Sequence, residues 1–158
     1  MSVLNLYVVN GQEVGADKYK YKLSWLKSVT AHLKKDLNKT KYYVVLGDFN
    51  IAPEDIDVYD PKAWKDKILC SKKERESLNK ICALGFKDTF RIFPQEKEMF
   101  SWWDYRTGAF GRNRGLRIDL ILANDNLAKK CTSSYIDVGP RKNDRPSDHT
   151  PVVSVFDI

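Results

Sequence analysis

Two short segments contain acidic, amide and imidazole side chains at a spacing that could serve chemistry on a charged substrate. Asp48 and Asn50 follow a buried apolar run, and if extended geometry continues they point to the same side. They would form an anionic site with a hydrogen-bond donor beside it. His149 lies next to Asp148 in a chain with 2 histidines, and an imidazole titrates near neutral pH. For an isolated motif, turn hydrogen bonds after Gly47 are the more common explanation of the first pair.

Two further polar residues lie among apolar neighbours on expected strands. Because adjacent residues of a strand do not face each other, the acid that orients His149 should come from another segment. Asp119 is the candidate, since a carboxylate among apolar residues must be paired when it is buried. Solvent exposure of Asp119 is the alternative. Tyr7 occupies a similar position on the first strand, where a phenol could donate to a phosphate oxygen or simply pack.

Aromatic residues run directly into a basic loop. Trp102 and Trp103 open this segment, and no acidic residue interrupts its arginines, which are Arg106, Arg112, Arg114 and Arg117. Arginines bind phosphates, and an aromatic wedge can open a groove or fill a vacated base position, so the composition suits DNA. Core packing of the tryptophans is the alternative, and we expect one of them to pack inward. A second basic patch, at Arg141, Lys142 and Arg145, could bind phosphate or simply be solvated.

The elements that position these residues follow from hydrophobic periodicity. Short apolar or alternating runs predict strands at 3–9, 42–46, 118–122 and 152–156. Apolar residues at helical spacing predict helices over 21–37 and 72–84. Ser71 and Glu74 have the spacing of a capping box at the start of the second helix, and Gly85 follows its end. Strands and helices mix without a strict repeat, which predicts one α/β domain over 1–158.

Composition limits the class of protein. The chain has 158 residues, 42% hydrophobic and 30% charged, and a net charge of +6, which suits a polyanionic partner without proving one. Cys70, Cys82 and Cys131 form no C-x-x-C pair, so neither a disulfide framework nor a zinc site is indicated. The apolar runs are too short to span a bilayer. We therefore expect no membrane partner and a cytoplasmic location, close to the nucleoid if the source is bacterial.

Five segments taken in order resemble the exonuclease III family of AP endonucleases, within the endonuclease/exonuclease/phosphatase superfamily. They are Tyr7, 47–53 (GDFNIAP), 100–106 (FSWWDYR), 114–120 (RGLRIDL) and 147–149 (SDH). The first and last motifs recur among metal-dependent phosphoesterases in general, and the third and fourth narrow the resemblance to DNA repair. The resemblance implies a DNase I-like layered β-sandwich flanked by helices. It also implies a nuclease of base-excision repair that incises duplex DNA 5′ to abasic sites and trims 3′ ends.

The same resemblance implies a role for each polar residue. Asp48 would be the general base that orients the attacking water, and Asn50 would fix its geometry or stabilise the transition state. Asp119 would orient His149, which would contact the scissile phosphate. Tyr7 would stabilise the developing negative charge or the leaving group.

The resemblance also implies a metal and a DNA interface. Mg²⁺, with Mn²⁺ as a possible substitute, would be held by Asp48, Asn50 and Asp148. The loop of Trp102 would probe the abasic gap. The expected DNA contacts are Trp102, Arg106, Arg112, Arg114 and Arg117, and the expected partner is double-stranded DNA with abasic sites or 3′ ends.

The chain departs from the family at its N-terminal side. Family members have a further N-terminal stretch with an Asn and a metal-binding Glu in a Gln-Glu motif; Gln12 and Glu13 follow the first strand and do not match it. We therefore expect the C-terminal part of the domain, with an apolar sheet face left for a missing N-terminal half or for self-association to cover. An inactive DNA-binding fragment is the main alternative, and a phosphatase acting on small phosphorylated molecules or lipids is a weaker one.

Overall fold

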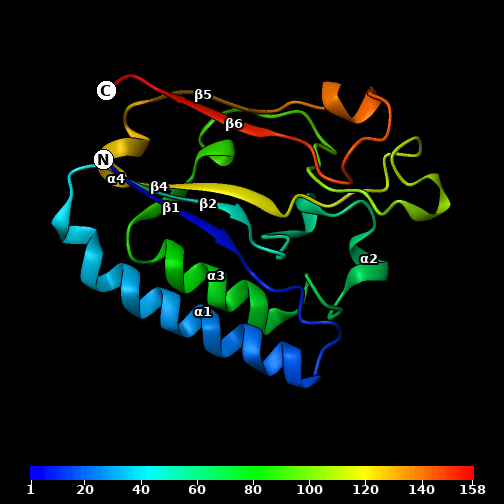
Figure 1. Cartoon of the computed structure of the whole chain (residues 1–158), viewed down its shortest axis with the longest axis horizontal. Coiled ribbons are helices and arrows are strands. Elements are labelled where there is room, and N and C mark those ends of the chain that lie inside the picture. Colours follow the sequence, from blue (N-terminus) through cyan, green and yellow to red (C-terminus); the bar gives the residue numbers. More distant parts are fainter.

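The computed structural model describes all residues from 1 to 158 and arranges them in helices and two sheets (Figure 1). The strands are β1 (Ser2–Tyr7), β2 (Tyr43–Asp48), β3 (Phe86–Asp88), β4 (Asp119–Asn124), β5 (Cys131–Ile136) and β6 (Val152–Phe156). The α-helices are α1 (Asp17–Asp36), α2 (Pro61–Trp64), α3 (Lys72–Cys82) and α4 (Asp125–Ala128). Short 3-10 turns are η1 (Leu37–Lys39), η2 (Asp55–Asp57), η3 (Thr89–Ile92), η4 (Arg106–Gly108) and η5 (Gly139–Lys142).

The two sheets and two long helices form three layers. The larger sheet has the order β1-β2-β4-β3, with β1 parallel to β2 and the other pairs antiparallel. The smaller sheet is the antiparallel pair β5-β6. Figure 1 shows α1 and α3 on one side of the larger sheet and β5-β6 on the other. The expected mixed α/β architecture is confirmed.

The apolar run of β2 is unbroken because both of its faces are buried. Val45 belongs to the core beneath the helices, where it joins Leu26 of α1 and Ile81 of α3. Val44 faces the opposite way and packs with Leu127 of α4. A strand covered on both faces has no solvent side on which polar residues would be favoured.

All six elements expected from periodicity are present. The helix α1 begins at Asp17, earlier than the expected start at position 21. Ser71 and Glu74 form the expected capping box of α3, with each side chain accepting from the other residue's backbone N–H. Four elements were not expected, namely β3, β5, α2 and α4. The elements α2, α4 and β3 contain three or four residues each, too few to show a hydrophobic period.

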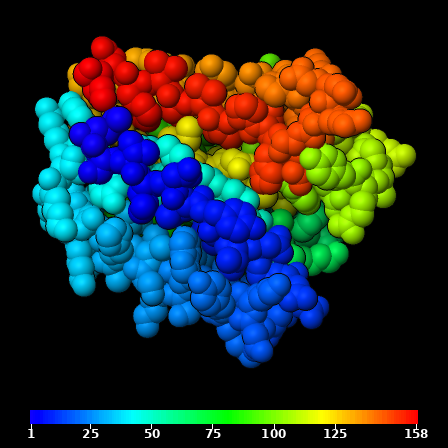
Figure 2. All heavy atoms as spheres, viewed as in Figure 1, coloured from blue at the N-terminus to red at the C-terminus, as the bar shows by residue number.

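Two strands have apolar side chains that no other part of the chain covers. Val3 of β1 is 57% exposed and Val155 of β6 is 46% exposed. Figure 2 shows the first residues of the chain, in blue, crossing the visible face below the C-terminal strand, in red. The chain contains no helix with the length and apolar character that a membrane crossing requires.

Candidate active site

The register of the larger sheet brings three of the predicted residues to one level. Tyr7 at the end of β1 pairs with Asp48 at the end of β2. Asp48 in turn pairs with Asp119 at the start of β4. Tyr7 is 67% exposed, so its ring does not pack inward. Three adjacent strands therefore carry Tyr7, Asp48 and Asp119 at paired positions of the sheet.

Gly47 allows β1 and β2 to approach closely just before Asp48. Its φ is +129°, and a Cβ atom at this position would lie 2.0 Å from the backbone oxygen of Leu6. A side chain of any kind would push the two strands apart. The glycine thus fixes the distance between the ends of β1 and β2, where the site residues begin.

Asn50 meets Asp48 through hydrogen bonds, although the geometry is not the one expected. The backbone N–H of Asn50 donates to Asp48 Oδ1 at 2.8 Å, and its Nδ2 donates to Asp48 Oδ2 at 2.8 Å. Nδ2 also donates to the backbone oxygen of Val8 at 2.9 Å. Extended geometry does not continue, because Asn50 has φ +48°. The side chains converge through a tight turn instead of strand alternation.

Asp119 and His149 form the predicted pair. Nδ1 of His149 lies 2.9 Å from Oδ2 of Asp119, across 30 positions of sequence. Ser101 supports the acid, because its Oγ donates to Asp119 Oδ2 at 2.7 Å. The same Oγ accepts from the backbone N–H groups of Ile118 and Asp119, both at 3.0 Å. The carboxylate is therefore held from two sides, and the imidazole is oriented by it.

Burial and neighbouring charges shift the pKa values of Asp48 and His149. Burial raises the pKa of Asp48 from 3.8 to about 6, and the negative charge of Asp119 adds to the rise, against the backbone N–H of Asn50 and the charge of His149. Burial alone would lower the pKa of His149, but the hydrogen bond and charge of Asp119 outweigh it and raise that pKa above 6.5. Asp48 therefore titrates close to neutral pH, and His149 favours its charged form.

Asp148 and Trp102 connect the histidine loop to the aromatic segment. Trp102 Nε1 donates to Asp148 Oδ2 at 3.0 Å, and the backbone N–H of Trp103 donates to the oxygen of Asp148 at 3.0 Å. Trp102 is partly exposed, whereas Trp103 is 1% exposed and packs with Phe100. One of the two tryptophans does pack inward, as expected, and the other lies beside the site.

Three of the four arginines predicted to contact DNA are on the surface. They are Arg106, Arg112 and Arg114. The prediction for Arg117 does not fit, because its side chain is 1% exposed and pairs with Asp57 and Asp88, each at 2.7 Å. Arg141 of the second basic patch is likewise buried, with its guanidinium 4.8 Å from the ring centre of Phe110. These two buried cations hold loops together and cannot reach a phosphate backbone.

The oxygen donors of the site fit a hard cation. No group of three or more His, Cys, Asp or Glu side chains is placed to hold a metal ion by itself. The available donors are the side-chain oxygens of Asp48, Asn50 and Asp148. Mg²⁺ takes one or two carboxylates and keeps several waters, which such a set can satisfy. Burial, followed by the negative charge of Asp119, raises the pKa of Asp48, and a cation beside this carboxylate would oppose the rise.

Sequence reasoning missed three residues that support the site. Ser101 is named only as part of the aromatic motif, and Asn10 belongs to none of the five motifs, although its Nδ2 donates to Asn50 Oδ1 at 3.3 Å. Lys22 lies on α1 and belongs to none of the five motifs, but it is 0% exposed and its Nζ donates to the oxygen of Asn50 at 2.7 Å. The flanking residues give no signal for Lys22, since Lys20 also lies between two aromatic residues and is exposed.

The chain is similar to known nucleases along nearly its whole length. The sequence profile of the endonuclease/exonuclease/phosphatase family matches residues 4–149. Exodeoxyribonuclease III of Haemophilus influenzae is 33% identical over 164 residues, which cover 99% of this chain and 61% of that protein. The five motifs indicated relatives of this kind.

Solved structures show the same similarity in three dimensions. The 3′ phosphatase NExo from Neisseria, bound to a product DNA hairpin, has a TM-score of 0.96 and 40% identity, covering 99% of this chain and 61% of that one. An AP endonuclease from Archaeoglobus fulgidus has a TM-score of 0.92 and 39% identity, again covering 99% and 61%. The DNase I-like layered fold is confirmed. This chain spans about three fifths of the length of these relatives.

Proposed function

The chain belongs to the endonuclease/exonuclease/phosphatase family, and from that membership we propose that it carries the hydrolytic site of a DNA-repair nuclease. Its substrate would be duplex DNA, cut 5′ to abasic sites or trimmed from 3′ ends. The observation that carries the proposal is the meeting of Asp48 and Asn50 with the Asp119–His149 pair at one end of a sheet. A partly exposed Trp102 lies beside this cluster. The names of the relatives, which are exodeoxyribonucleases and AP endonucleases, support the substrate class.

Asp48 acts as the general base in this proposal. Its carboxylate takes a proton from a water molecule, and the water oxygen forms a new bond to phosphorus. The bond between phosphorus and the 3′ oxygen breaks, and this oxygen takes up a proton from solvent, so that the products carry a 3′ hydroxyl and a 5′ phosphate. A pKa of about 6 suits a base that works near neutral pH. Asn50 fixes the carboxylate through two hydrogen bonds.

His149 and Tyr7 stabilise negative charge in this proposal. The raised pKa of His149 favours an imidazolium, which binds a non-bridging phosphate oxygen. Asp119 and Ser101 keep the ring in place. The exposed Tyr7 lies one strand from Asp48. Its phenol donates a hydrogen bond to the phosphate oxygen or leaving oxygen on which negative charge develops.

Mg²⁺ completes the proposed site, with Mn²⁺ as a possible substitute. Asp48, Asn50 and Asp148 would hold the ion through oxygen atoms. When bound, a divalent cation neutralises the charge that builds up on the phosphate. Around it, the chain's own residues bind the phosphate and move the proton of the attacking water.

The aromatic and basic segment forms the proposed DNA interface. Trp102 lies between the site and this loop and is bonded to Asp148. Arg106, Arg112 and Arg114 are exposed on the same segment and would bind backbone phosphates. Arg117 is excluded from the interface by its burial.

One cleavage experiment tests the proposal. A duplex with a single abasic-site analogue is incubated with Mg²⁺ and this chain, alone and together with a separately made N-terminal half of a related enzyme. We expect incision 5′ to the analogue in at least one of the two reactions, and its loss in His149→Ala. Salt-sensitive binding without incision in either reaction would show a DNA-binding fragment and reject the hydrolytic proposal. Hydrolysis of a phospholipid or inositol phosphate in place of DNA would reject the substrate class.

A further inference from the structure

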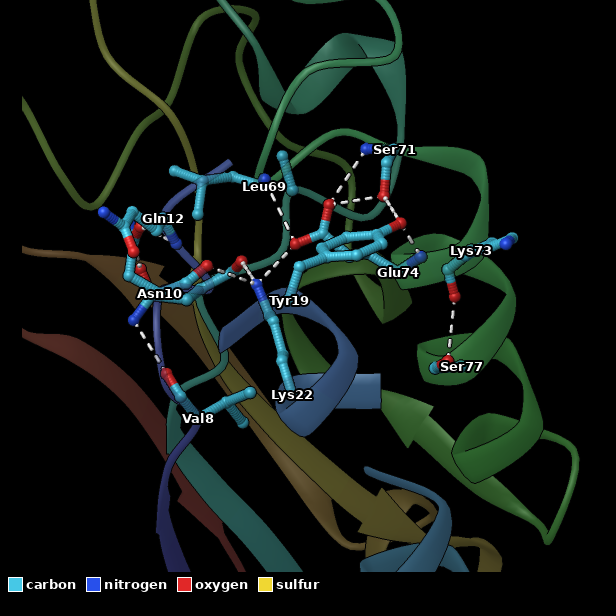
Figure 3. Close-up of polar contacts among 12 residues, drawn as sticks. Val8, Asn10, Gln12, Tyr19, Lys22, Leu69, Ser71, Lys73, Glu74 and Ser77 are labelled. Atoms are coloured by element: carbon cyan, nitrogen blue, oxygen red, sulfur yellow. Dashed lines mark hydrogen bonds and ion pairs between the residues drawn. The ribbon is translucent and has the colours of Figure 1, made fainter. Parts of the chain in front are cut away.

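The ammonium group of Lys22 lies at a junction between two loops of the proposed active site. Lys22 belongs to α1, and its side chain is 0% exposed. Nζ donates to the backbone oxygen of Asn50 at 2.7 Å. It also donates to the backbone oxygen of Asn10 at 3.1 Å and pairs with Glu74 Oε1 at 2.5 Å (Figure 3). Three acceptors therefore match the three donors of the ammonium group.

Glu74 is a counter-ion that other bonds hold in place. Its Oε1 accepts from the backbone N–H of Leu69 at 3.2 Å. Its Oε2 accepts from the N–H of Ser71 at 3.1 Å and from the Ser71 hydroxyl at 2.6 Å. The same hydroxyl lies 2.8 Å from the Tyr19 hydroxyl of α1 (Figure 3). Lys22 is thus anchored to the first turn of α3, where Glu74 completes the capping box.

Lys22 contacts Asn50, the residue on which the geometry of the proposed active site depends. Asn50 has φ +48°, a conformation that costs a non-glycine residue free energy and persists where its surroundings hold it. Lys22 supplies such a hold on the Asn50 carbonyl. The side chain of Asn50 donates to Asp48 at 2.8 Å, so a shift of this backbone would move the contact with the general base.

We propose that Lys22, with Glu74 as its fixed counter-ion, is a positioning residue for the hydrolysis proposed above. Its ammonium group sets the backbone of Asn10 and Asn50, and through them the side-chain contact between Asn50 and Asp48. An ion pair that served stability alone would need no bond to either loop, and apolar residues of similar volume often serve as well. Here two of the three acceptors are carbonyls of the loops that follow β1 and β2. The catalytic part of this inference rests on the proposed function.

The test compares the wild-type chain with the double variant Lys22→Met/Glu74→Gln. Lys22→Met alone would leave Glu74 buried without a counter-charge, so both charges are removed together. The first measurement is the NMR signal of the Asn50 side-chain amide in metal-free protein. We expect shifted, slowly exchanging protons in the wild type, because they donate to Asp48 and Val8. In the double variant they should move toward the shifts of a solvated amide and exchange faster.

The second measurement is cleavage, made under the condition in which the wild type cuts DNA. We expect kcat of the double variant to fall by about 10- to 100-fold, as for other supporting residues, while KM for the duplex stays within about twofold. Leu33→Ala is the matched control, because Leu33 is buried on the same helix, about three turns from Lys22. It should lower the melting temperature and leave kcat and the Asn50 signal unchanged.

Two results would overturn the inference. One is a double variant with wild-type kcat and a wild-type Asn50 signal. The other is an equal change of both in Leu33→Ala, which would show that they report general destabilisation. If the wild-type chain cleaves no DNA, alone or with an N-terminal half, the proposed function fails. The NMR comparison then still decides whether Lys22 positions Asn50.

Discussion

The imidazole of His149 lies 2.9 Å from the carboxylate of Asp119, and this acid also accepts a hydrogen bond from the buried Ser101. We expect Asp119→Asn to lower the pKa of His149, because it removes the charge and the charge-assisted hydrogen bond that raise it. The pKa can be followed by NMR on the ring proton of His149. The exposed His32 serves as the internal reference, since the chain has 2 histidines.

The same variant should lose activity. Because a misoriented imidazole no longer meets the phosphate, we expect Asp119→Asn to reduce kcat by about 100-fold, within the usual range for acid–base and supporting groups. The exposed Asp17 offers a matched control, and Asp17→Asn should cleave at the wild-type rate. An unchanged His149 pKa in Asp119→Asn would contradict the proposed role of the pair.

Asp48 should make the stability of the metal-free chain depend on pH. Its pKa is raised from 3.8 to about 6, so the folded chain holds the proton more tightly than the unfolded chain does. The stabilisation is fully present below pH 3.8 and is lost as pH rises to about 6. We expect the free energy of unfolding in EDTA to fall by about 1 kcal/mol over this window, after allowing for solvent screening. Urea unfolding of Asp48→Asn should show no such fall from this group.

Mg²⁺ should restore the stability that the metal-free chain loses at neutral pH through Asp48. A cation that binds the folded chain through Asp48 stabilises it by mass action. We therefore expect added Mg²⁺ at pH 7 to raise the melting temperature of the wild-type chain and to leave that of Asp48→Asn unchanged. An equal increase in both proteins would contradict Asp48 as a metal ligand.

The sequence predicted the parts of the site that depend on local spacing. Gly47 with Asp48 and Asn50 marked the turn after a buried strand, and Asp119 was correctly paired with His149 because neighbours in a strand cannot face each other. The pairing of Asp119 with His149 needed the direction of side chains in a strand, which periodicity supplies. The contact between Asp48 and Asn50 forms through a turn instead of the expected strand alternation. The layered fold was expected mainly from the resemblance of the five motifs.

Contacts between distant segments could not be predicted in the same way. Arg117 lies in a basic loop by sequence, yet its partner Asp57 is 60 positions away. Lys22 and Glu74 are 52 positions apart. No local pattern of charge distinguishes a lysine that finds a buried partner from one that remains in solvent, because the choice depends on which helices pack together.

We expect mutation of Arg117 to reduce stability and mutation of Arg114 to weaken DNA binding. Arg117→Met removes one of the two arginines that pair with the buried Asp57, the other being Arg91, and it also removes the pair with Asp88. We expect unfolding to become easier by up to about 3 to 5 kcal/mol, the cost of breaking a buried pair. Arg114 is exposed, so Arg114→Ala should leave stability unchanged, weaken duplex binding and reduce the salt dependence of binding by about one unit of slope. Urea unfolding and fluorescence anisotropy over a KCl series measure the two effects. A salt slope that changes in neither variant would remove this loop from the DNA interface.

Trp102 offers two separable roles, because its ring is partly exposed while its Nε1 donates to Asp148 at 3.0 Å. Trp102→Phe keeps an aromatic face and loses the hydrogen bond, whereas Trp102→Ala loses both. We expect Trp102→Ala to weaken binding of an abasic duplex by about 1 to 3 kcal/mol, the usual value of an aromatic contact with a base. Trp102→Phe should bind nearly as the wild type does. Anisotropy in EDTA, which prevents cleavage, measures both.

The second role of Trp102 is to orient Asp148, a proposed metal ligand. Without the Trp102 bond, Asp148 is free to turn, so Trp102→Phe should require about 10-fold more Mg²⁺ for half-maximal cleavage, as for other residues that orient a metal ligand. Trp25→Phe is the control, since Trp25 packs against the core beneath the helices, whereas Trp102 packs against a different cluster. Equal Mg²⁺ requirements in Trp102→Phe and the wild type would show that Asp148 needs no support from Trp102. Equal DNA binding in Trp102→Ala and the wild type would show that the ring does not contact the duplex.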